Sequence, residues 1–243
     1  MLRYDQLKQN SRRFLALTGL TPKEFELLLP AFERAYTRTY PPHRTQTGQP
    51  RQRKTGGGRK GALDSIEQKL LFALVYQKTY PVQTLLGEVF ELSQSRANDW
   101  IHRLLPILQD ALDNLGVLPE RDPRQFARHE KQQGSSPDYL IDGTERRRQR
   151  PKDPEKQALH YSGKKKAHSD KNIVIVHTRT KRVGYLSQTY AGKTHDKKVA
   201  DTEPIVYPYG SKLGKDTGFQ GYEPRRCQTY QPKKAAPERV DRC

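Results

Sequence analysis

The feature that most constrains this chain is a change in hydrophobic period about halfway along it. Between residues 62 and 115 the apolar side chains recur every three or four positions, which is the spacing of one face of an α-helix. From Asp138 onwards, short β-branched and aromatic runs replace that pattern, as in NIVIVHT at 172–178. The sequence therefore predicts a helical region followed by a region built on a β-sheet.

The N-terminal segment LTPKEFELLLPAF contains a clear helix start. Thr21 is a good N-cap residue, Pro22 suits the first helical position, and Glu24 completes a capping box with Thr21. Apolar side chains then follow at helical spacing. We therefore expect helices within residues 1–42.

Residues 62–115 are expected to form three helices. Tyr80-Pro81 separates the first from the second, because the residue before a proline is driven out of the helical conformation. Ser93 is the expected N-cap of the third helix. A short helix, a tight turn and a longer helix are typical of a helix-turn-helix domain, although a plain helical bundle shares the pattern. The residues expected to contact DNA are Gln94, Ser95, Arg96, Asn98 and Arg103.

The charge of the chain favours a polyanionic partner. Lys and Arg number 45 against 27 Asp and Glu, which leaves a formal net charge of +18. No apolar run approaches the ~18 residues of a membrane span, and two cysteines are too few for a disulfide framework. We expect a cytoplasmic protein that binds nucleic acid and no membrane.

A basic, glycine-rich linker occupies residues 43–61, between the two helical regions. A flexible arm against DNA phosphates and a solvated spacer explain its composition equally well. If the segment is an arm, its DNA-contacting residues are Arg51, Arg53, Lys54, Arg59 and Lys60.

After a polar linker at 116–137, the second half predicts an α/β domain with a mixed sheet. Strands are expected at 138–144, 172–178, 182–190 and 210–222, and a short helix at 194–201.

The first of these strands leads to Asp142 and the last to Asp216. Two aspartates at the ends of neighbouring strands suit a magnesium ion, although Asp-Gly is also a common turn dipeptide. Nearby basic residues would then steer a phosphate-rich substrate: Arg146, Arg147, Arg148 and Arg150.

Several motifs occur in a fixed order: GGGRKGAL, the helix-turn-helix pattern, DYLIDGTE, YSGKKKAHSDKNIVIV, AGKTHDKKVAD and GKDTGFQGY. In this combination the chain resembles bacterial insertion-sequence transposases of the DDE superfamily that begin with a helix-turn-helix domain. The resemblance implies an RNase H-like catalytic domain at 138–222, in which two aspartates and a glutamate bind two Mg²⁺ or Mn²⁺ ions. Water cleaves DNA at the element's ends, and the freed 3′-hydroxyl attacks target DNA.

By motif position, Asp142 resembles the first acid of this family and Asp216 the second. The basic stretch after the first strand is expected to contact phosphates, through Lys164, Lys165 and Lys166. His195-Asp196 also matches a motif, of uncertain role. The family's glutamate lies on a helix beyond the second aspartate, and the sequence after Asp216 does not read as such a helix.

The remaining glutamates, Glu223 and Glu238, are poor replacements for the missing acid. We therefore expect a truncated catalytic domain, a disordered tail at 223–243, and a chain inactive alone. It would be a first reading frame that needs a frameshift, or a decayed copy. The resemblance also implies a homodimer on double-stranded DNA at the bacterial nucleoid. A non-catalytic DNA-binding fragment and an RNA-binding protein are the alternatives.

Overall fold

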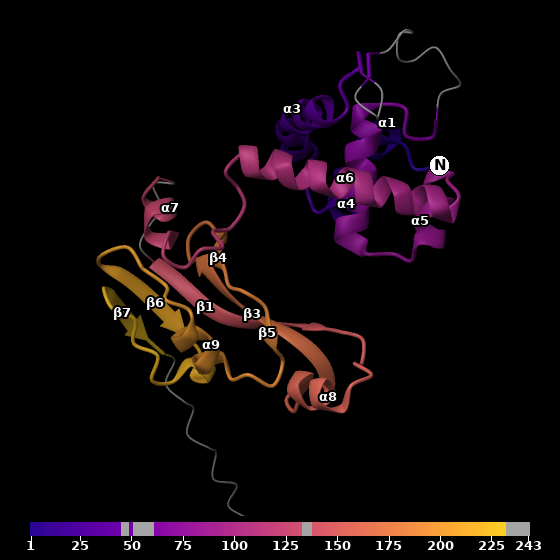
Figure 1. The fold of residues 1–243 in the computed structure, drawn as a ribbon. Helices are drawn as coiled ribbons and strands as arrows, with labels where there is room; N and C mark the ends of the chain where they lie inside the picture. Colours follow the sequence, from indigo (N-terminus) through magenta and orange to yellow (C-terminus); the bar gives the residue numbers. More distant parts are fainter. Residues whose placement is uncertain (45–48, 51–60, 133–137, 232–243) are drawn as a thin grey trace, which may run out of the picture. The chain divides into compact units, whose positions relative to one another are not determined.

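The computed structural model describes residues 1–44, 49–50, 61–132 and 138–231. The chain divides into two compact units, residues 1–117 and 118–243, the first helical and the second built on a sheet (Figure 1). The fold is therefore α+β, with the helical domain first, as the change in period predicted. No helix in these ranges has the length and apolar character needed to cross a membrane.

The first unit is a bundle of helices around one core. Its elements are α1 (Tyr4–Leu7), α2 (Ser11–Thr18), α3 (Pro22–Thr39), α4 (Ile66–Thr79), α5 (Gln83–Phe90) and α6 (Gln94–Asn114). Buried side chains from the whole range form this core, including Phe14, Phe25, Phe72, Phe90 and Leu104. Residues 1–42 and 62–115, which the sequence presents as separate segments, therefore pack around one shared core.

The expected helix starts are confirmed. The Thr21 hydroxyl accepts a hydrogen bond from the backbone N–H of Glu24, whose carboxylate accepts the N–H of Thr21 in return. Ser93 caps α6 in the same way by accepting the N–H of Arg96 at 3.3 Å. These caps satisfy N–H groups that the first turn of a helix leaves without partners.

The second unit is a mixed sheet with strand order β2-β3-β1-β6-β7, and β4 and β5 also pair with β3. The strands are β1 (Asp138–Arg147), β2 (Tyr161–Ser162), β3 (Ala167–His177), β4 (Val183–Leu186), β5 (Tyr190–Ala191), β6 (Ser211–Lys215) and β7 (Cys227–Tyr230). The pairs β1–β3, β3–β4, β2–β3 and β3–β5 are antiparallel, whereas β1–β6 and β6–β7 are parallel. This mixed sheet agrees with the expectation for the second half.

One face of the sheet carries the core of the second unit. Alternate residues of β1, Tyr139 and Ile141, are buried there, as are Ile173 and Ile175 of β3. The helices of this unit are α7 (Phe126–Gln132), α8 (Pro154–His160), α9 (Asp196–Thr202) and the short 3-10 helix η1 (Thr217–Phe219). Helices α7 and α8 lie near opposite ends of the sheet (Figure 1).

Two expectations about connecting segments are wrong. Residues 116–137 do not form a simple linker, because α7 places Phe126, fully buried, among the rings of Tyr139, Tyr185 and Tyr207. Residues 223–231 are not a disordered tail, because β7 continues the sheet beside β6. The rest of that predicted tail, 232–243, lies outside the described residues.

Candidate catalytic and DNA-binding sites

The turn between α5 and α6 is tight. A Cβ atom on Gly87 would stand only 2.6 Å from the carbonyl oxygen of Leu92, so a glycine lets the chain fold back this closely. The Leu92 N–H donates to the Gly87 carbonyl at 2.9 Å, and Glu91 between them has a left-handed backbone (φ 55°). The structure thus has the short helix, turn and longer helix of the predicted helix-turn-helix.

The start of α6 presents polar side chains joined to α5 by hydrogen bonds. The Gln83 amide donates to Asn98 Oδ1 at 2.8 Å and accepts from the Gln94 amide at 2.5 Å. Arg103 lies over the ring of Trp100, with 5.8 Å between its guanidinium carbon and the ring centroid. The predicted DNA contacts of this helix are exposed or half-buried: Gln94, Ser95, Arg96, Asn98 and Arg103.

The basic linker cannot be compared with its prediction. Its candidate DNA contacts lie outside the described residues: Arg51, Arg53, Lys54, Arg59 and Lys60.

In the second unit the parallel pairing of β1 with β6 brings the two predicted acids to adjacent positions. The last registered pair is Ile141 with Lys215, and Asp142 and Asp216 are the residues that follow on the two strands. The backbone at Asp216 is still extended, with φ −81° and ψ −178°. Because neighbouring strands lie about 4.8 Å apart, acids 74 positions apart in sequence belong to one small region.

Side-chain alternation indicates that both acids share one face of the sheet. Leu140 and Gly214 are a registered pair, and Leu140 Cδ2 lies 2.6 Å from the point where a Cβ on Gly214 would stand. Side chains two residues further along an extended strand return to the same face. Asp142 and Asp216 are therefore expected on the face that carries Leu140, opposite the buried core.

Both carboxylates retain unused acceptor capacity. Asp142 Oδ1 accepts the N–H of Gly143 at 2.8 Å, and Asp216 Oδ1 accepts the N–H of Gly218 at 2.9 Å. Both residues are exposed, and neither forms an ion pair with a cationic side chain in the described part of the chain. A carboxylate bound in this way still has lone pairs for a cation.

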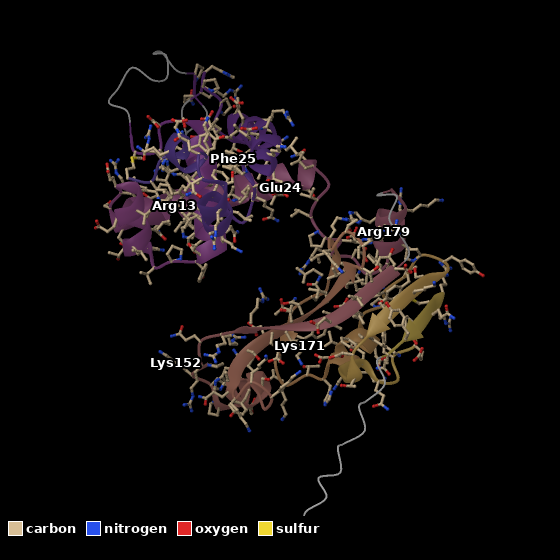
Figure 2. All side chains as sticks on the ribbon, turned by 180° about the vertical axis from the view of Figure 1, so that it is seen from behind. Arg13, Glu24, Phe25, Lys152, Lys171 and Arg179 are labelled. Carbon is tan, nitrogen blue, oxygen red and sulfur yellow. The ribbon has the colours of Figure 1, made fainter. Side chains whose placement is uncertain are left out.

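A buried lysine lies beneath this edge of the sheet. Lys171 of β3 is only 6% exposed, and its Nζ lies 2.9 Å from Asp196 Oδ1 and 3.4 Å from Glu145 Oε1 (Figure 2). The same ammonium donates to the carbonyl of Thr194 at 2.8 Å. Lys171 thereby connects β1, β3 and the N-terminus of α9. Sequence reasoning missed it because the expected strand began one residue later, at 172, and lysines usually face water.

Asp196 touches both backbone segments that bear the predicted acids. Its Oδ1 lies 2.5 Å from the position of a Cβ on Gly143, next to Asp142. Its Oδ2 lies 3.0 Å from the position of a Cβ on Gly218, and Asp216 Oδ1 lies 3.1 Å from that same point. The uncertain Asp196 of the sequence motif therefore contacts the backbone next to both predicted acids, and at Gly143 it does so from the core face of the sheet, opposite the Asp142 side chain.

Glu145 forms the other half of the buried ion pairs. Burial by itself raises the pKa of the Glu145 carboxyl, but hydrogen bonds from Ser162 and Ser169 and the charge of Lys171 outweigh burial and lower it. The Ser169 hydroxyl donates to Glu145 Oε2 at 3.0 Å. Glu145 is therefore held ionised beside Lys171.

The predicted arginines near Asp142 differ in their partners. Arg148 donates to Asp170 Oδ1 at 2.9 Å, so an acid already compensates its charge. Arg146 donates to Asn172 Oδ1 at 2.8 Å and forms no ion pair with an acid of the described ranges. The remaining predicted phosphate contacts are exposed: Arg147, Lys164, Lys165 and Lys166.

A third metal-binding acid is missing from the described residues. No group of three or more His, Cys, Asp or Glu side chains there could hold a metal ion. The Glu223 carboxylate already accepts hydrogen bonds from Lys215 and Thr229, and these lower the pKa of its carboxyl. Glu238 lies outside the described residues.

Comparison with protein families matches each unit separately. Residues 61–114 match the helix-turn-helix of DDE superfamily endonuclease, and residues 141–243 match the DDE superfamily endonuclease domain. No curated protein and no solved structure matches the chain significantly. Fold and matches together define a DNA-binding helix-turn-helix domain followed by an endonuclease-type domain. The two matches are consistent with a DDE-type transposase that carries a helix-turn-helix ahead of its endonuclease domain.

Proposed function

We propose that this protein cleaves and joins DNA strands at the ends of an insertion sequence, using a divalent cation bound by Asp142 and Asp216. The observation that carries the proposal is the parallel register of β1 and β6. Its last pair is Ile141 with Lys215, so Asp142 and Asp216 are the next residue on each strand. Neither Asp142 nor Asp216 forms an ion pair with a cationic side chain in the described residues. Double-stranded DNA is the proposed substrate and partner.

The donor set fits a hard cation. Magnesium prefers oxygen ligands and commonly takes one or two carboxylates from the protein, completing its shell with water and phosphate oxygens. Asp142 and Asp216 would supply those carboxylates. Once bound, such an ion lowers the pKa of water and stabilises charge on a phosphodiester. Two carboxylates suit one Mg²⁺ or Mn²⁺, whereas the second ion that the family resemblance implies needs further ligands.

The residues of this chain have separate tasks in that reaction. Asp142 and Asp216 would hold the cation, which would bind an oxygen of the scissile phosphate. Asp196, held by Lys171, keeps the segments around Gly143 and Gly218 in place. The first turns of α6 would read the element's ends, with Gln83 orienting Gln94 and Asn98 toward the DNA.

A second candidate is a DNA-binding protein without catalysis, which would hold element ends and inhibit transposition. The observation that favours it is the lack of a third acidic ligand among the described residues.

In either case we propose a homodimer, because the two ends of an element must be held together. We also propose that the protein resides at the bacterial nucleoid.

The two candidates are separated by nicking of end-containing DNA in Mg²⁺ or Mn²⁺, with Mn²⁺ binding measured by electron paramagnetic resonance. We expect Asp142→Asn and Asp216→Asn each to abolish both signals. The matched control is Asp201→Asn, an exposed acid of the same unit that pairs with Lys197. Salt-sensitive DNA binding without Mn²⁺ binding or nicking would overturn the first candidate and leave the second.

A further inference from the structure

An open groove of about 740 Å³ lies at the end of the second unit that carries α8. Its walls come from α8, β2, the start of β3 and the turn after β5, and its principal side chains are Arg150, Gln157, Tyr161, His168 and Lys193. None of the described residues that line it is acidic. A groove with cationic walls and no acid is suited to an anion.

Two cations in this groove are available for a ligand. Gln157 Oε1 accepts hydrogen bonds from Arg150 Nε at 3.0 Å and Nη2 at 2.8 Å, which holds the guanidinium in place without neutralising it. Lys193 is exposed, and its ammonium forms no ion pair with an acid in the described ranges. Arg148 nearby is different, because Asp170 compensates its charge.

The surrounding sequence strengthens the positive field. Residues 146–168 contain nine Arg and Lys against two Asp and Glu. Of those two acids, Asp153 caps the N-terminus of α8 and Glu155 lies in its first turn, and neither lines the groove. A field of one sign over a concave surface concentrates an anionic polymer there.

An aromatic side chain accompanies the cations. Tyr161 is 42% exposed, and its ring contacts His168 edge-on with 5.6 Å between centroids. Nucleic-acid-binding grooves commonly combine cations that follow the backbone with aromatic rings on which bases stack. Tyr161 thus favours a nucleic-acid strand over a small inorganic anion.

The groove lies within reach of the candidate catalytic site along one strand. Asp142 and Arg148, at the end of β1, are six residues apart, which corresponds to roughly 20 Å of extended chain. About six nucleotides of DNA cover that distance at 3.4 Å each. One DNA molecule can therefore contact both places.

We propose that this groove binds the phosphodiester backbone of a DNA strand beside the cleavage point, with Arg150 and Lys193 on phosphates and Tyr161 against a base or sugar. The identity of the ligand as DNA rests on the proposed function. Binding itself requires no metal, so it can be measured when cleavage cannot occur.

The test is the salt dependence of DNA binding by the full chain in EDTA, followed by fluorescence anisotropy. Arg150→Gln with Lys193→Gln should reduce the slope of log K against log salt by about 1 to 2, since each lost phosphate contact removes roughly 0.7 to 0.9. Arg179→Gln with Lys181→Gln removes the same charge at the opposite end of the sheet, where Figure 2 labels Arg179 far from Lys152. This control pair should leave the slope nearly unchanged.

A direct readout uses the photo-crosslinking substitution Tyr161→p-benzoylphenylalanine, with Tyr209→p-benzoylphenylalanine as the control. Tyr209 is also exposed, at 91%, but it precedes β6 at the other end of the sheet. We expect DNA to crosslink at position 161 and not at 209, and duplex and single-stranded probes identify which form occupies the groove. Equal slopes for both charge pairs, or no crosslink at position 161, would overturn the proposal that this groove binds DNA. If the wild-type protein bound no Mn²⁺ but still showed the slope change and the crosslink, only the proposed metal site would be overturned.

Discussion

Gly143 shows how a single residue constrains the candidate site. It lies between Asp142 and Thr144 on β1, and its missing side chain leaves room for the Asp196 carboxylate. The Asp-Gly pair, which by sequence alone reads as a common turn, here belongs to a strand. The glycine is needed for close approach and not for an unusual backbone angle.

Gly143→Ala should therefore destabilise the second unit by about 1–3 kcal/mol and weaken Mn²⁺ binding, because the new methyl overlaps Asp196 Oδ1. Adding Asp196→Ala removes the obstructing carboxylate, so the cost of Gly143→Ala should be smaller in that background. Urea denaturation of the four proteins measures this cycle. Gly163→Ala is the matched control, since nothing lies within 4 Å of its Cβ position; equal costs for both glycines would contradict the packing argument.

Lys171 is the second residue with a large expected effect. Lys171→Met removes one cation and leaves Glu145 and Asp196 without their partner, which should cost about 3–5 kcal/mol at pH 7. Lys198→Met, an exposed lysine on α9, should cost little.

The Lys171 effect should also depend on pH in a defined direction. The folded-state pKa of Glu145 is lowered, so its contribution is present above the carboxyl's ordinary pKa and is lost as pH falls through the folded value. The stability difference between wild type and Lys171→Met should thus stay nearly constant from pH 7 down to the carboxyl's ordinary pKa of 4.5, and shrink as the pH falls further toward 3. Urea denaturation across this range measures it, and a difference independent of pH would contradict the ion-pair explanation.

At the scale of elements, three short segments of the second unit, α7, α8 and β7, could not be predicted from the sequence. Helix α7, helix α8 and strand β7 have few apolar residues, so no periodicity in the sequence indicates them. Each is stabilised by contacts with distant residues, as Phe126 is by three tyrosine rings.

Phe126→Ala should accordingly destabilise the second unit by about 3–5 kcal/mol, because a fully buried ring leaves a cavity among tyrosines. The control is Leu159→Ala on α8, whose side chain is 52% exposed and should cost less than about 0.5 kcal/mol. Thermal or urea unfolding followed by circular dichroism measures both. A small effect of Phe126→Ala would mean that residues 116–137 are the linker that the sequence predicted.

At the scale of the whole molecule, the two units have separate hydrophobic cores. Such a chain need not unfold in a single step. Basic residues outnumber acidic ones in each unit, so both contribute to the net charge of +18. This distribution suits a protein that contacts DNA through more than one surface.

We expect two unfolding transitions in scanning calorimetry of the full chain. Phe72→Ala should lower the midpoint of one transition and Phe126→Ala that of the other, since each ring is buried in only one core. If either substitution shifted both transitions equally, the units would be energetically coupled.

The sequence by itself determined the helix starts at Thr21 and Ser93, the three helices of the helix-turn-helix and the change to strands after Asp138. These features depend on interactions between residues close in sequence, such as capping and periodic burial. Tertiary structure alone decided that β1 pairs in parallel with β6, bringing Asp142 and Asp216 to adjacent positions, and that Lys171 and Asp196 lie beneath them. Those contacts join segments tens of residues apart, and their energy comes from packing and charge pairing that no local pattern records.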